Sequence, residues 1–207
     1  MNRTDLTYYG EFGPVLEVQR TLMLAEIRRI LDVLTADAEH SPAEHLRSRI
    51  KSSGSLQAKL RKQGYPEDAA SGMRHLMDLI GVRIITHFVG DVYAILEELM
   101  RSECWEVVRV KDYISNPKPN GYRSVHVIVQ FPIDCGGLTS MCAEIQLRTI
   151  AMDCWASLEH QLKYKKNIRN TELIVRELKR CADEMASTDL SMQTIREMIY
   201  LEGGAEV

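Results

Sequence analysis

Apolar residues recur along the chain at two spacings, which indicate helices at both ends and strands between them. After Pro14 the apolar positions are three or four residues apart, the period of an amphipathic helix, and a proline suits the start of a helix. The expected helices lie over 14–36, 53–63, 67–77, 90–102, 149–165 and 171–187, and a short separate element surrounds 47–51. We expect a break at 187–189, where Ser, Thr and Asp are suited to cap a new helix that runs to 201.

Period-two alternation indicates four strands, over 80–88, 105–114, 121–132 and 139–148. The third strand has a buried face of valines and Phe131, while Tyr122, Ser124 and His126 share the opposite face. In the fourth strand Glu144 lies on the polar face, and a hairpin would bring the two polar faces to the same side of the sheet. The order of elements predicts a mixed α/β fold with a largely antiparallel sheet, one helical crossover and long helices at both ends.

Composition limits the class of protein. The chain has 207 residues, of which 45% are hydrophobic and 27% charged, as is typical of a globular protein with a proper core. Because the formal net charge is −3, any anion-binding site must be a local basic cluster, and nothing indicates DNA as a partner. Five cysteines without a C-x-x-C pair suit reduced thiols, and no apolar run approaches membrane length. We therefore expect a cytoplasmic protein with no membrane partner.

The segment from His45 to Pro66 is rich in cations and contains no acidic residue. Its cations are Arg47, Arg49, Lys51, Lys59, Arg61 and Lys62. A solvated helix face is the more common explanation of such charges. However, Arg49 and Lys51 share one face of the expected element, directly before a Ser-Gly-Ser turn that starts a helix. Fixed cations beside the amides of a helix N-terminus form a ready site for a polyphosphate.

Asp78 and Arg83 stand at the start of the strand over 80–88. Alone, Asp78 is most often a turn cap, but it is also well placed to hold Mg²⁺, which favours one or two carboxylates together with phosphate oxygens. Arg83 has apolar neighbours, where an unpaired guanidinium is costly, so a carboxylate or a purine would account for it.

The segment over 116–131 brings an aromatic ring and hydrogen-bond donors together after a lysine-bearing loop. A tyrosine on a strand and a lone histidine are usually structural. Tyr122 beside His126, however, offers a platform for a base, with stacking worth roughly 1–3 kcal/mol. Glu144 would share this surface, and together with Asp78 it provides two carboxylates beside a basic cluster. That combination favours metal-assisted phosphoryl chemistry.

Four motifs, "DLIGVRI", "NGYRSVH", "EIQLRT" and "WASLEHQLKYK", occur in the order and spacing of the synthetase domain of RelA/SpoT homologues. The chain resembles this family from about Pro14 to its C-terminal helices, and within it the single-domain small alarmone synthetases of the RelQ type. The resemblance implies a nucleotidyltransferase-like fold with Mg²⁺ as cofactor. It implies transfer of pyrophosphate from ATP to the ribose 3′ hydroxyl of GDP or GTP, giving ppGpp or pppGpp and AMP. It also implies a synthetase domain over 1–168, a helical extension over 169–207 and a homotetramer built through the long terminal helices.

On the ATP side, the resemblance implies that Arg49 and Arg83 sandwich the adenine. It assigns the ATP phosphates to Lys51, Ser55 and Lys59, of which the last two match by spacing alone.

On the acceptor side, the resemblance implies that Tyr122 stacks on guanine and that Lys118 and His126 contact phosphate. Asn120 and Arg123 belong to the same motif and are expected at the same site.

Catalysis is implied for two carboxylates. Asp78 would hold the metal, Glu144 would coordinate metal or activate the 3′ hydroxyl, and Gln146 would support Glu144. A ribose hydroxyl is a poor nucleophile at neutral pH, so a base or metal in contact with it agrees with this chemistry. Glu159 and His160 match a family pair near the site to which no step is assigned.

Two alternatives stay open. Toxic relatives pyrophosphorylate adenine nucleotides or the 3′ end of tRNA, and the same tyrosine and basic cluster would serve them. A non-catalytic nucleotide- or RNA-binding regulator would not need two acids beside a polyphosphate site, and RNA binding is not otherwise indicated. The chain lacks an adjacent His-Asp pair of the hydrolase type, so we expect synthesis without hydrolysis.

Overall fold

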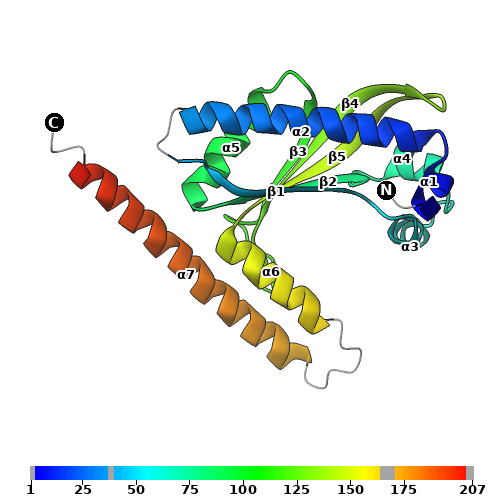
Figure 1. Ribbon diagram of the computed structural model, residues 1–207. Helices are drawn as coiled ribbons and strands as arrows, with labels where there is room; N and C mark the ends of the chain where they lie inside the picture. The colour runs from blue at the N-terminus through cyan, green and yellow to red at the C-terminus, as the bar shows by residue number, and fades with distance from the viewer. Residues whose placement is uncertain (1–2, 37–39, 164–170, 204–207) are drawn as a thin grey trace.

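The structure is a computed structural model that describes residues 3–36, 40–163 and 171–203 (Figure 1). Its helices are α1 (Arg3–Tyr9), α2 (Phe12–Ala36), α3 (Ser53–Gln63), α4 (Ala69–His75), α5 (Val89–Arg101), α6 (Ile150–Lys163) and α7 (Thr171–Gly203). Its strands are β1 (Ala43–Ile50), β2 (Ile80–Thr86), β3 (Glu106–Asp112), β4 (Val125–Cys135) and β5 (Leu138–Thr149). Over the described ranges, no helix combines the length and the apolar character that a membrane span requires.

The five strands form one mixed sheet in the order β1-β2-β5-β4-β3. Strands β2 and β5 are parallel, and the other neighbouring pairs are antiparallel, so the predicted mixed, largely antiparallel α/β fold is confirmed. Strands β4 and β5 form the expected hairpin, with His126 opposite Gln146 and Ile128 opposite Glu144. This register places polar side chains of two adjacent strands on one face of the sheet.

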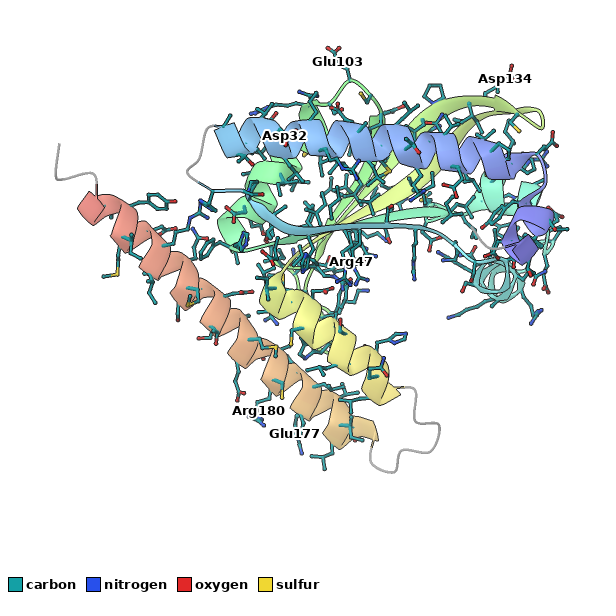
Figure 2. The ribbon with its side chains drawn as sticks, in the orientation of Figure 1. Asp32, Arg47, Glu103, Asp134, Glu177 and Arg180 are labelled. Atoms are coloured by element: carbon teal, nitrogen blue, oxygen red, sulfur yellow. The ribbon has the colours of Figure 1, made fainter. Side chains whose placement is uncertain are left out.

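The other face of the sheet is apolar and forms the core. Val125, Val127 and Val129 have no exposed surface, and they join buried residues of α2, α5, β2 and β5 in one cluster. Figure 1 shows α2 along this face, whereas α6 and α7 lie on the opposite side of the sheet. Arg47 of β1 also lies on the side of α6 (Figure 2). The basic cluster and the polar face of the hairpin are therefore on the same side of the sheet.

The third predicted strand begins later than expected. Strand β4 starts at Val125 rather than at 121, because Gly121 has a φ of +88° and its amide donates to the Lys118 carbonyl in a turn. Tyr122 and Ser124 consequently lie on the preceding loop. Ser124 is fully buried, and its hydroxyl donates to the Leu147 carbonyl at 3.0 Å. Arg148 donates to both the Ser124 and the Tyr122 hydroxyl, so the two side chains lie at one guanidinium, but Ser124 offers no exposed surface to a ligand.

The predicted break at 187–189 is also wrong, since α7 is continuous from Thr171 to Gly203. The hydroxyl of Thr188 donates to the Glu184 carbonyl one turn earlier instead of capping a new helix. The carboxylate of Asp189 accepts a hydrogen bond from Thr149 at the end of β5. The element around 47–51 is the end of the longer strand β1, and α1 has no counterpart among the predicted elements. The expected domain boundary at 168/169 lies outside the described residues.

Candidate active site

Asp78 lies just before β2 and is held by two lysines. Its Oδ2 accepts from Lys51 Nζ at 2.7 Å and lies 2.9 Å from Lys59 Nζ. Burial alone would raise the pKa of this carboxyl, but hydrogen bonds from the two ammonium groups hold the pKa below its ordinary value. The second oxygen, Oδ1, is buried and has no hydrogen-bond partner within the described structure. The carboxylate is therefore anionic at neutral pH and has one oxygen that no described protein group binds.

Lys51 and Lys59 lie on either side of the capped N-terminus of α3. Lys51 directly follows β1, and the side chain of Ser52 accepts from the Ser55 amide at the start of α3. Ser55 itself is exposed in the first turn, as a phosphate ligand at a helix N-terminus requires.

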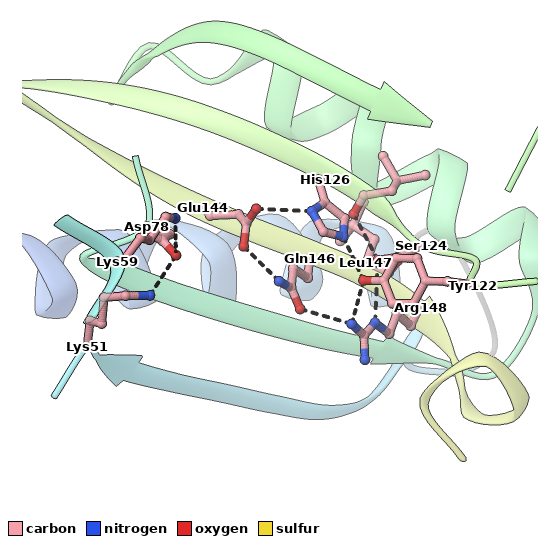
Figure 3. A network of polar contacts seen from close by, with 11 residues as sticks. Lys51, Lys59, Asp78, Tyr122, Ser124, His126, Glu144, Gln146, Leu147 and Arg148 are labelled. Carbon is pink, nitrogen blue, oxygen red and sulfur yellow. Dashed lines mark hydrogen bonds and ion pairs between the residues drawn. The ribbon is translucent and has the colours of Figure 1, made fainter. Parts of the chain in front are cut away.

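Glu144 of β5 is held by its neighbours on the polar face (Figure 3). Its Oε1 lies 3.0 Å from Nδ1 of His126, and its Oε2 accepts from Gln146 Nε2 at 2.7 Å. Burial would raise the pKa of Glu144, but the hydrogen bond and charge interaction with His126, together with the hydrogen bond from Gln146, hold the pKa below its ordinary value. Glu144 is thus an oriented, ionised carboxylate on a rigid strand.

A continuous set of hydrogen bonds extends from Glu144 to the acceptor loop, which we define as residues 116–124. Nε2 of His126 lies 2.7 Å from the Tyr122 hydroxyl, and that hydroxyl accepts from Arg148 Nη2 at 2.6 Å. Arg148 also donates to Oε1 of Gln146 at 3.2 Å and is only 6% exposed (Figure 3). Although Tyr122 lies on a loop, its side chain meets His126 as predicted.

Asp153 of α6 binds two arginines that lie on the neighbouring strands β2 and β5. Its Oδ1 accepts from Arg83 Nη1 at 3.0 Å and from Arg148 Nη1 at 3.2 Å. Burial lowers the pKa of the Arg83 guanidinium, and the charge of Arg148 lowers it further, while Asp153 opposes both effects. One carboxylate therefore holds two mutually repelling guanidiniums side by side.

Two cavities meet at Arg49 and Arg83, which line both of them. One has a volume of about 280 Å³ and is lined by Arg47, Ser48, Arg49, Asp78, Gly81, Val82, Arg83, Glu144 and Gln146. The other has a volume of about 420 Å³ and is lined by Arg49, Arg83, Tyr122, Arg148, Ala156, Ser157, Glu159, His160 and Gln161. The first cavity is lined by both carboxylates and the second by Tyr122, so Asp78 and Glu144 face a cavity that adjoins the one beside the tyrosine.

The acceptor loop places Lys118 over two aromatic rings. Its Nζ is 4.6 Å from the centroid of Tyr122 and 4.5 Å from that of Tyr113. Asn120 accepts from the Tyr122 amide at 3.3 Å and donates to Glu159 Oε1 at 3.0 Å. Lys118 and Asn120 thus contact Tyr122 and Glu159, two residues that line the second cavity.

Arg123 is the exception among the predicted acceptor residues. Its guanidinium turns to α7, where Nη2 donates to Asp183 Oδ1 at 2.9 Å and Nη1 to the Ala182 carbonyl at 3.2 Å. Arg123 therefore links the acceptor loop to α7 and does not point to the cavity beside Tyr122.

Strand alternation predicts Arg148 beside Glu144 and Gln146, whereas Tyr113 and Asp153, which also line or support the site, were not identified from the sequence. Arg148 shares a strand face with Gln146, so alternation alone places it correctly but says nothing of its partners. Asp153 carries no signal at all, because its partner Arg83 is 70 residues away in the sequence.

Mg²⁺ is the metal that the donor set fits. The orphaned Oδ1 of Asp78 and the carboxylate of Glu144 line the same cavity, and hard oxygen ligands of this kind, completed by phosphate oxygens, suit Mg²⁺. In the described part of the chain, no group of three or more His, Cys, Asp or Glu side chains forms a complete metal site, so substrate oxygens would have to complete this one.

The chain is similar to proteins of one family. The family model for the "region found in RelA / SpoT proteins" matches residues 48–169. The GTP pyrophosphokinase YwaC of Bacillus subtilis (strain 168) is 42% identical over 161 residues, which cover 77% of this chain and 77% of that protein. The GTP pyrophosphokinase YjbM of the same organism is 33% identical over 172 residues, covering 83% and 80%.

Solved structures agree with this likeness. Small alarmone synthetase 1 from Bacillus subtilis bound to its product pppGpp superimposes with a TM-score of 0.76 at 28% identity, covering 93% of this chain and 96% of that one. The same protein bound to AMPCPP gives a TM-score of 0.70 at 27% identity, covering 91% and 95%. Small alarmone synthetase 2 from Bacillus subtilis gives 0.73 at 37% identity, covering 91% and 99%.

Proposed function

This chain belongs to the RelA/SpoT family, and from that premise we propose that it is a small alarmone synthetase. It transfers pyrophosphate from ATP to the ribose 3′ hydroxyl of GDP or GTP, which gives ppGpp or pppGpp and releases AMP. The observation that carries this proposal is the pair of adjoining cavities, one with two carboxylates and the other with a tyrosine, which share Arg49 and Arg83.

ATP is proposed to occupy the cavity of about 280 Å³. Arg49 and Arg83 line it and are suited to stack on the two faces of adenine. Lys51 and Lys59 stand beside Asp78, and with the exposed Ser55 at the start of α3 they would bind the phosphates. The lysines would then exchange part of their interaction with Asp78 for phosphate oxygens.

The acceptor nucleotide is proposed to stack on Tyr122 in the second cavity. Lys118 lies beside that ring, and Asn120 and His126 border it, which provides donors for the phosphates and the base. His126 joins Tyr122 to Glu144, so a guanine on the ring would bring its ribose toward the carboxylate.

Glu144 is proposed to accept the proton of the 3′ hydroxyl. The 3′ oxygen then forms a bond to the β-phosphorus of ATP, and the bond from that phosphorus to the oxygen shared with the α-phosphate breaks. AMP leaves with that oxygen. The hydrogen bonds from His126 and Gln146 hold Glu144 in one orientation, which is the main requirement for such proton transfer.

Mg²⁺ is proposed as the cofactor, held by Asp78 and Glu144. When bound, it would neutralise charge on the phosphates of ATP and so favour attack on them. Lys51 and Lys59 keep Asp78 ionised for this purpose at neutral pH.

A homotetramer is the proposed assembly. Apolar residues are exposed on the two long helices, among them Val18 and Leu22 on α2 and Leu190 and Ile199 on α7. Contacts between copies would cover such surfaces, and light scattering of the purified protein measures the number of subunits.

The experiment that tests the proposed function uses ATP labelled on the γ-phosphate, with GDP, GTP, an adenine nucleotide or tRNA as the acceptor. Label in ppGpp and pppGpp supports the proposal. Label in the adenine nucleotide or in tRNA alone would assign the chain to the toxic relatives, and label in none of them would favour a non-catalytic regulator. Incubation with purified ppGpp tests the expectation that the chain does not hydrolyse its product.

A further inference from the structure

Helix α7 packs directly on the acceptor loop. Gly121 is buried with a φ of +88°, and a Cβ added to it would lie 2.5 Å from the Ala182 Cβ and 3.1 Å from the Lys179 Cα. The second of these atoms is backbone, so the helix and the loop are in contact along their main chains. Only a glycine fits between them.

Hydrogen bonds from Arg123 stabilise this contact between the acceptor loop and α7. Its guanidinium donates to the carboxylate of Asp183 and to the Ala182 carbonyl on α7, and also to the Gly121 carbonyl on the loop. The side chain is 15% exposed, so the three hydrogen bonds are partly shielded from water. The hydrogen bonds from Lys179 and Arg123 lower the pKa of Asp183, which keeps the acceptor of this contact charged at neutral pH.

Helix α7 is in turn anchored to elements that carry the site. Trp155 of α6 donates from Nε1 to the Leu178 carbonyl at 2.9 Å. Thr149, at the end of β5, donates to Asp189 at 2.5 Å. Because β5 carries Glu144, the loop is connected through α7 to the same strand that holds the proposed base.

We propose that Arg123 is a positioning residue for the acceptor site: through Asp183 and Ala182 it holds the acceptor loop against α7, and so fixes Tyr122 before the nucleotide binds. The identity of that nucleotide rests on the proposed function. A loop that is already ordered loses less conformational freedom on binding, so this contact increases acceptor affinity without touching the acceptor. The C-terminal helix thus contributes to the site within one chain, apart from any contact between copies.

Hydrogen exchange in the absence of nucleotide tests the contact itself. Asp183→Asn and Arg123→Gln are each expected to increase amide exchange in the acceptor loop relative to wild type. Arg180→Gln is the matched control, since Arg180 points away from the sheet on α7 and pairs with Glu177 and Glu184 (Figure 2). Unchanged loop exchange in Asp183→Asn would overturn the proposal, whatever reaction the protein catalyses.

Steady-state kinetics then test the consequence for the acceptor. Arg123→Gln and Asp183→Asn should each raise the KM for GDP about three- to ten-fold, the size of an ordinary net hydrogen-bond contribution, and leave the KM for ATP unchanged. The effects of the two single variants should be less than additive in the double variant, because Arg123 and Asp183 are partners in one ion pair. Arg123→Lys should fall between wild type and Arg123→Gln.

Two kinetic results would contradict this role. A raised KM for GDP in Arg123→Gln but not in Asp183→Asn would make Arg123 a direct ligand of the nucleotide. Equal effects on ATP and GDP, together with a lower melting temperature, would make the contact a general support of the fold. Failure of the wild-type protein to use GDP or GTP would instead refute the proposed function, and the exchange experiment would still decide the role of Arg123.

Discussion

The hydroxyl of Tyr122 lies 2.7 Å from Nε2 of His126. The other nitrogen of the same ring lies 3.0 Å from Glu144, so one imidazole connects the ring proposed to bind guanine with the carboxylate proposed to activate the ribose. In the proposed function, binding of the base and placement of the reacting hydroxyl would therefore be coupled through the His126 side chain.

Tyr122 should determine acceptor use through its ring. Tyr122→Ala is expected to raise the KM for GDP and GTP about 10- to 100-fold, because a stacking contact is worth roughly 1–3 kcal/mol, and to leave ATP binding unchanged. Tyr122→Phe keeps the ring and loses the hydrogen bonds to His126 and Arg148, so it should have a smaller effect on KM. Calorimetric titration measures the binding of each nucleotide, and steady-state kinetics measure the KM values of the two variants. Equal loss of ATP binding in Tyr122→Ala would contradict the assignment.

Asp153 should couple the two nucleotide sites. Asp153→Asn leaves Arg83 and Arg148 adjacent without their shared anion, so both guanidiniums are expected to separate. We expect the KM to rise for both ATP and GDP, and we expect bound GDP to change ATP affinity less in the variant than in wild type. Titration of ATP with and without GDP measures that coupling. An effect on one nucleotide alone would show that Asp153 serves only one site.

Most helices and strands could be predicted because hydrophobic periodicity and capping residues are local in the sequence. The helix expected over 53–63 has those bounds, because Ser52 caps its start and Gly64, with a φ of +77°, ends it. The residues near the site were also identified by local motifs. Contacts between residues far apart in the sequence could not be predicted. Arg123 binds Asp183, 60 residues later, and no periodicity indicates such a pair.

Surface and core roles of polar residues were equally hard to separate. Ser124 alternates with Tyr122 and His126 in the sequence, yet it is fully buried because the chain turns at Gly121 before the strand begins. At 187–189, the Thr188 hydroxyl, of a type that often caps a helix start, instead donates to the Glu184 carbonyl in the preceding turn of a continuous helix.

Asp78 should give the protein a pH-dependent contribution to stability. Its folded pKa is below the ordinary value of 3.8, so the contribution is present at pH values above 3.8 and is lost as the pH falls through the lower folded pKa. Asp78→Asn is therefore expected to reduce the free energy of unfolding at pH 7 by about 2 kcal/mol, since two lysines lose a charged partner. Urea unfolding at pH 7 and pH 3 should show this difference shrinking in acid. A constant difference would contradict the pairing with Lys51 and Lys59.

The metal role of Asp78 has a readout that does not depend on turnover. Mg²⁺ should raise the melting temperature of the ATP-bound wild-type protein, because a ligand that binds only the folded state stabilises it. Asp78→Asn should lose most of this Mg²⁺-dependent shift. A shift of wild-type size would remove Asp78 from the metal site.

Glu144→Gln tests the central claim most directly, because it replaces the proposed base with a side chain of the same shape. The variant and wild type are compared for ATP and GDP binding and for formation of labelled ppGpp, with Glu106→Gln, exposed at the start of β3, as the matched control. Both nucleotides are expected to bind as in wild type, while product formation falls about 10²- to 10⁴-fold, the usual contribution of a general base. Product formation at the wild-type rate in Glu144→Gln would contradict the account.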